Sequence, residues 1–163
     1  MDTAQYLNLF QKATDQLDQS AFAQNQLELK VGVWLNSFVL KIQKPAWQNP
    51  NRLPFDGGIF FSVWINGNSI AESKIHYNVH ALKLRELSRY KIQSREFAQA
   101  FRLRFKPFEH DWPNVSTTFG PLTLMEGWVK IDMIEMGALI ANLATKFLSV
   151  QHIIDDLLDE RKK

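Results

Sequence analysis

The chain contains no cysteine among its 163 residues. This absence excludes disulfide bonds, zinc sites with thiolate ligands and cysteine nucleophiles. Charge of one sign is also lacking, because 19 basic residues face 17 acidic ones and the net charge is only +2. A hydrophobic content of 45% with 22% charged residues is that of a folded globular protein. At this length we expect a single α+β domain over residues 1–163.

Long uninterrupted apolar runs are missing as well. The longest apolar stretch, residues 133–150, contains Glu135, Asn142 and Lys146, which is unlike a membrane-spanning helix. The first residues lack the basic start and apolar run of a signal peptide. We therefore expect a cytoplasmic protein that does not bind a membrane.

Sequence motifs for catalysis or cofactor binding are absent too. The chain has no P-loop, no G-x-G-x-x-G dinucleotide fingerprint and no G-x-S-x-G nucleophile elbow. We therefore expect no bound cofactor, and the sequence leaves open whether the protein is an enzyme.

Two strand-like segments, 58–65 and 69–80, are the most informative part of the chain. Successive residues of a strand point to opposite faces of a sheet. One face of this hairpin is apolar, with Ile59, Phe61 and Val63. The other face is mixed, with the residues Phe60, Ser62, Trp64, Glu72, Lys74, His76, Asn78 and His80.

The turn of this hairpin determines its register. A two-residue loop at Asn66-Gly67 would place Glu72 and Lys74 on the apolar face, which is unfavourable. We therefore predict a three-residue loop over 66–68, which pairs Phe61 with Ser73 and Phe60 with Lys74.

The mixed face of the hairpin is the best candidate for a functional surface, because Phe60 and Trp64 are large apolar groups to leave in water. Joined by Trp34 from a neighbouring strand, it predicts a ligand-binding site that comprises Trp34, Phe60, Trp64, Lys74, His76 and His80. The alternatives are an ordinary solvent-facing sheet surface and a face covered by a helix. No metal site is predicted, because His76 and His80 on one strand lie about 13 Å apart.

The remaining pattern predicts an α+β fold, in which an antiparallel sheet of about four to five strands is flanked by an N-terminal helix, a mid-chain helix and a long C-terminal helix. Alternation over 27–43 breaks at Asn36-Ser37, which favours two strands, and residues 122–130 suit a last strand. Residues 44–57 suit a long loop. Helices are expected over 3–20, from Ser94 to before Pro107, and over 133–160.

The C-terminal helix has a heptad pattern of apolar residues: Met133, Met136, Ile140, Leu143, Phe147, Val150, Ile154 and Leu157. Such a pattern is typical of a coiled-coil seam. It favours a central helix packed on the sheet, and the alternative is a homodimer through this helix.

The leading functional hypothesis is a non-catalytic binding protein that uses the aromatic and histidine face for a small molecule or a protein partner. An alternative is nucleic-acid binding, because residues 83–106 hold eight basic and two acidic side chains. Its candidate contacts are Arg85, Arg89, Arg95, Arg102 and Arg104. A second alternative is a small hydrolase that uses His110, within Glu109-His110-Asp111, together with the His76/His80 face.

Overall fold

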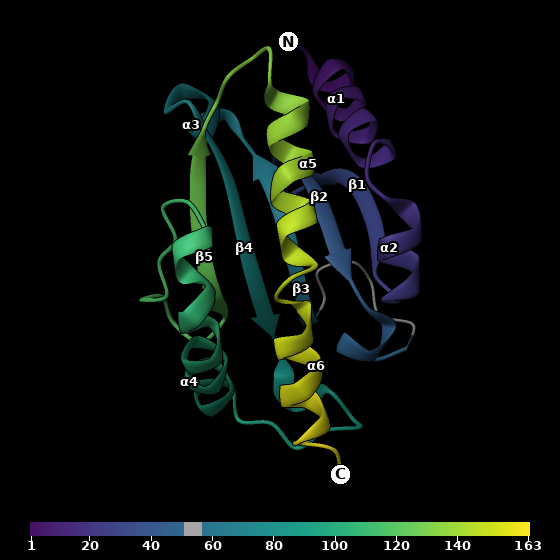
Figure 1. Ribbon diagram of the computed structural model, residues 1–163, viewed down its shortest axis with the longest axis vertical. Coiled ribbons are helices and arrows are strands. Elements are labelled where there is room, and N and C mark those ends of the chain that lie inside the picture. The colour runs from purple at the N-terminus through teal and green to yellow at the C-terminus, as the bar shows by residue number, and fades with distance from the viewer. Residues whose placement is uncertain (51–56) are drawn as a thin grey trace.

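The computed structural model of the protein describes residues 1–50 and 57–163 (Figure 1). Five antiparallel strands form one sheet in the order β1-β2-β3-β4-β5: β1 (Glu28–Trp34), β2 (Ser37–Gln43), β3 (Gly58–Ile65), β4 (Lys74–Leu82) and β5 (Thr123–Lys130). The α-helices are α1 (Thr3–Asp15), α2 (Gln19–Gln24), α3 (Gly67–Ala71), α4 (Ser94–Phe105), α5 (Met136–Phe147) and α6 (Gln151–Asp159). Short 3₁₀ helices are η1 (Pro45–Trp47), η2 (Leu84–Glu86) and η3 (Lys106–Asp111). This is the predicted α+β fold class.

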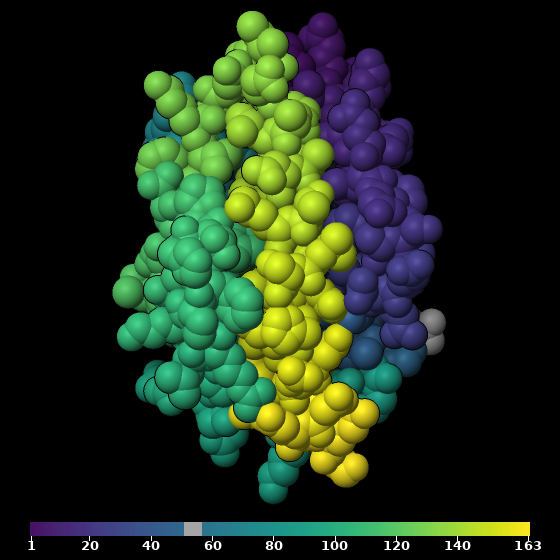
Figure 2. Space-filling model, in the orientation of Figure 1, coloured from purple at the N-terminus to yellow at the C-terminus, as the bar shows by residue number. Residues whose placement is uncertain are grey.

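The main helices all pack on one face of the sheet, which we call the helix face (Figure 1). Figure 2 shows α5 and α6 running along this side of the molecule, between α4 on one flank and α1 and α2 on the other. At the centre of the core, the Phe61 ring of β3 stacks on the Phe147 ring of α5 with 4.4 Å between centroids. The opposite face of the sheet, which we call the open face, lies on the far side in Figure 1.

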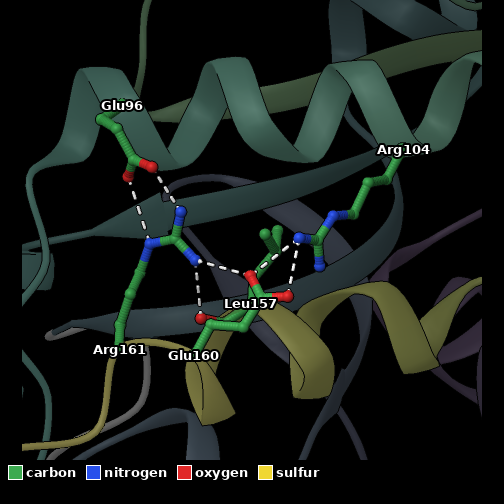
Figure 3. A network of polar contacts seen from close by, with 5 residues as sticks. All are labelled: Glu96, Arg104, Leu157, Glu160 and Arg161. Atoms are coloured by element: carbon green, nitrogen blue, oxygen red, sulfur yellow. Dashed lines mark hydrogen bonds and ion pairs between the residues drawn. The ribbon is translucent and has the colours of Figure 1, made fainter.

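Ion pairs join α4 to the end of α6 (Figure 3). Arg104 of α4 makes two hydrogen bonds of 2.7 Å to the Glu160 carboxylate, and Arg161 pairs with Glu96 at the other end of α4. These side chains are largely exposed except for Arg161, so each pair contributes modestly to stability. These ion pairs hold the C-terminal end of α6 beside α4.

The hairpin register predicted from the sequence was wrong. Asn66 caps α3: its side-chain oxygen accepts a hydrogen bond from the Ser69 backbone N–H, and the Ser69 hydroxyl oxygen accepts one from the Asn66 backbone N–H. This extra turn replaces the three-residue loop. Phe60 consequently pairs with His80 instead of Lys74, a shift of six residues. Because six is even, every side chain keeps its predicted face.

The first hairpin confirms the two strands expected from the break at Asn36-Ser37. Leu35 and Asn36 both have positive φ angles, 51° and 62°, as a two-residue type I′ turn requires. In the loop predicted over 44–57, residues 45–47 form η1, whereas 51–56 lie outside the described residues. Trp47 of η1 is buried and donates a hydrogen bond to Asp155 of α6.

The C-terminal helix is long but bent, since residues 148–150 separate α5 from α6. It starts at Met136 and not at 133, and Met133 is 54% exposed. The heptad residues from Met136 to Leu157 are all buried within the chain. They pack on the helix face, which agrees with the expected central helix packed on the sheet. The homodimer through this helix stays a prediction. Among the described residues no helix has the length and apolarity to span a membrane.

The Phe61–Phe147 stack makes Phe147 a test of the core. We expect Phe147→Ala to lower the free energy of unfolding by about 3–5 kcal/mol, because it removes a fully buried ring and leaves a cavity. Urea unfolding measures the change. The control is Leu103→Ala, whose side chain is 75% exposed and whose removal should change stability by less than about 0.5 kcal/mol. Equal losses in the two variants would contradict this account of the core.

Candidate ligand-binding site

The open face carries a hollow of about 410 Å³. Its apolar lining comprises Trp34, Leu35, Val39, Phe60, Trp64 and Leu82. Its polar lining comprises Ser37, Ser62, Asn66, Asn78, His80 and Glu126. Strands β1 to β5 all contribute, so the hollow spans the width of the sheet.

Aromatic rings form one row across this face. Trp64 stacks on His76 of β4 with 4.5 Å between ring centroids and 13° between planes. On β1 the Trp34 ring lies over Gly32, so closely that a Cβ atom there would come within 2.7 Å of the ring. Glycine at this position therefore lets the indole lie flat beside the hollow.

A chain of hydrogen bonds forms the next row. Ser62 Oγ donates to Asn78 Oδ1 over 2.5 Å, and Asn78 Nδ2 donates to Glu126 Oε1 over 3.2 Å. Ser62 and Asn78 are buried, whereas Glu126 is half-buried. The backbone of Glu126 also exchanges two hydrogen bonds with Ser116 on the outer side of β5. The row ends at the Glu126 carboxylate, which Asn78 contacts on one side, while Ser116 holds the Glu126 backbone on the other.

Both histidines of the open face have a lowered pKa. Burial removes water from the imidazoles of His76 and His80, and this outweighs the nearby Glu126 carboxylate, which raises the pKa of both. Lys74 lowers the pKa of His76 further, and Glu72 raises it. The two rings are therefore neutral at pH 7 and add no positive charge to the hollow.

Lys41 of β2 is the buried lysine of the open face. It pairs across the strands with Ser62, and its Nζ lies 4.8 Å from the centroid of the Phe60 ring. Burial, with repulsion from Lys30, lowers the pKa of Lys41 to about 8, although Glu28 raises it. Lys41 lies beside the hollow and is not part of its lining.

All six residues of the predicted site lie on the open face, and four of them line the hollow: Trp34, Phe60, Trp64 and His80. His76 lies against Trp64, outside the lining. Lys74 is further away, 4.5 Å from the Trp128 ring and 3.6 Å from Glu72. No described helix covers this face.

Sequence reasoning missed Glu126 as a site residue. The alternation of residues 122–130 places Glu126 and Trp128 on one side of the last strand, which was the available signal. What was lacking was the strand order, which sets β5 beside β4 and brings Glu126 opposite Asn78. Leu35, Val39 and Leu82 were missed for the same reason.

The arginines of the basic segment have mainly structural contacts. Arg102 donates to four backbone oxygens, two in the loop before β5 and two at the start of β5, and Arg104 pairs with Glu160. Arg89 donates to two backbone oxygens near η1. Arg85 and Arg95 are exposed. Nucleic-acid binding through this segment stays a prediction.

His110 is not brought together with the other histidines. It lies exposed on η3, with Nε2 3.4 Å from an Asp111 oxygen. Trp112, two residues further along the chain, packs against Phe61 on the helix face, whereas His76 lies on the open face. The constellation required by the hydrolase hypothesis is therefore divided between the two sides of the sheet.

Comparison with known proteins adds no identity. No protein-family model, no curated protein and no solved structure matches this chain. Within residues 1–50 and 57–163, no group of three or more His, Asp or Glu side chains is arranged to hold a metal ion. The functional argument therefore depends on the geometry of the open face.

The lowered pKa values of His76 and His80 predict a pH-dependent stability. The unfolded chain binds protons at its histidines below about pH 6.5, while the folded chain resists protonation, so the free energy of unfolding should fall as the pH drops below that value. Urea unfolding between pH 7.5 and pH 5 measures this slope. The double variant His76→Gln/His80→Gln should flatten it, and the exposed control His110→Gln should keep it. An unchanged slope in the double variant would refute the assignment.

Proposed function

We propose that the protein is a non-catalytic binding protein that holds a small organic molecule with a flat apolar body in the hollow of the open face. The observation that carries this proposal is the placement of the half-buried Trp34 and Trp64 on the side of the sheet that no described helix covers, with the fully buried Phe60 in the same lining. Two tryptophans that are left partly exposed beside a hollow are typical of a recognition surface.

The size and shape of the hollow favour a small molecule over a protein partner. A volume of about 410 Å³ falls within the range of small-ligand pockets, roughly 300–1,000 Å³. The aromatic walls, with the apolar Val39 and Leu82, supply contact area. The few polar groups converge on one row, which suits them to orient a ligand.

The polar groups of the hollow favour binding over catalysis. Of the two serines that line the hollow, Ser62 lies in the hydrogen-bonded row that ends at Glu126. Its hydroxyl donates to the Asn78 amide oxygen. An amide oxygen does not remove a proton, so Ser62 is not activated. His80 forms its nearest polar contacts with Leu122 O and the Thr123 hydroxyl, each at 3.4 Å, and not with Ser62.

Binding of N-phenyl-1-naphthylamine, a neutral apolar dye, tests this proposal. We expect fluorescence enhancement with the native protein and an affinity at least tenfold weaker for Trp64→Ala, because the flat wall of the hollow is lost. The matched control is Trp128→Ala, a tryptophan of the same face outside the hollow, which should bind the dye as the native protein does.

Thermal unfolding of both variants establishes that each remains folded. Equal dye affinities for native protein, Trp64→Ala and Trp128→Ala would exclude the hollow as the binding site.

A further inference from the structure

Among the described residues that line the hollow, Glu126 is the single acidic residue, and none is a lysine or an arginine. The other polar groups of the lining are hydroxyls, amides and the neutral imidazole of His80. One carboxylate in an apolar concavity gives the site a negative electrostatic character. The strength of that field is increased by the poor access of water to the floor, where Ser62 and Asn78 are buried.

The Glu126 carboxylate is incompletely satisfied by the protein. Oε1 accepts one hydrogen bond from the Asn78 amide, and Oε2 has no hydrogen-bond donor among the described residues. No lysine, arginine or histidine of residues 1–50 and 57–163 forms an ion pair with it. A half-buried carboxylate in this state interacts favourably with a cation from solution.

We infer that the natural ligand is an organic cation, an alkylated ammonium or protonated amine on an apolar body, with its charge between Glu126 and the aromatic walls of the hollow. This inference rests on the proposed function and names its ligand class. Indole faces attract cations through their quadrupoles, so the half-buried Trp34 and Trp64 favour the same charge as the carboxylate.

The open face already places cations against its aromatic rings. Lys41 lies over Phe60 at 4.8 Å, and Lys74 lies over Trp128 at 4.5 Å. Neither lysine pairs with Glu126. Lys41 is on β2, and three strand spacings separate β2 from β5, a distance of about 14 Å. Lys74 lies beside Glu72. An anionic ligand would instead meet the Glu126 carboxylate in a poorly hydrated hollow, and the repulsion between the two charges disfavours its binding.

Three ligands with one benzyl body test the inference by isothermal titration calorimetry: benzyltrimethylammonium, benzyl alcohol and phenylacetate. With the native protein we expect the cation to bind at least tenfold more tightly than the alcohol, and phenylacetate to bind most weakly. Glu126→Gln should weaken binding of the cation about tenfold and leave the alcohol unchanged, since glutamine keeps the acceptor for Asn78 and removes only the charge.

The matched control is Glu28→Gln, an exposed carboxylate of the open face outside the hollow, which should retain native affinity for the cation. The inference is overturned if Glu126→Gln binds the cation as tightly as the native protein, if Glu28→Gln loses as much, or if phenylacetate binds as well as the cation. In those cases dye binding that depends on Trp64 would still support the proposed function. If neither the dye nor any benzyl compound binds, both proposals fail.

Discussion

Strand β3 is apolar on both of its faces, and the rest of the structure depends on how the chain meets that constraint. Ile59, Phe61 and Val63 are buried on the helix face, where Phe147 of α5 stacks on Phe61. The main helices lie on this side alone, and on the other side Trp64 stays half-buried beside the hollow, whereas Phe60 is fully buried. The hollow on the open face, with Trp34 and Trp64 in its lining, lies on the side of β3 that no described helix covers.

The electrostatics of the open face follow from the same packing. Exclusion of water lowers the pKa of His76 and His80 and keeps them neutral, although both lie near Glu126. The buried floor also orders the hydrogen bonds from Ser62 through Asn78 to the carboxylate. A surface with the same residues in full contact with water would have protonated histidines near pH 6 and a screened carboxylate. The chemical character of the hollow is therefore a property of burial as well as of composition.

Local pattern predicted the faces of the sheet better than its register. The mixed face of the hairpin is correct for Phe60, Trp64 and His80, although their partners were wrong, because a strand preserves parity when the register moves by an even number. The error arose at Asn66, where a one-turn helix with its own capping box competed with a tight turn. The tight turn and the one-turn helix differ little in free energy, so the residues next to Asn66 do not reveal which of them forms.

The sequence by itself determined the alternation in the strands, the start of α4 at Ser94, and the aromatic and histidine residues of the open face. These features depend on chain neighbours within one turn or one strand pair. Only the tertiary structure decided that Glu126 joins Asn78, that Arg102 binds backbone oxygens, and that the C-terminal heptads pack on the sheet of their own chain. Those outcomes depend on strand order and helix placement, which are set by the burial of apolar surface between segments far apart in the sequence.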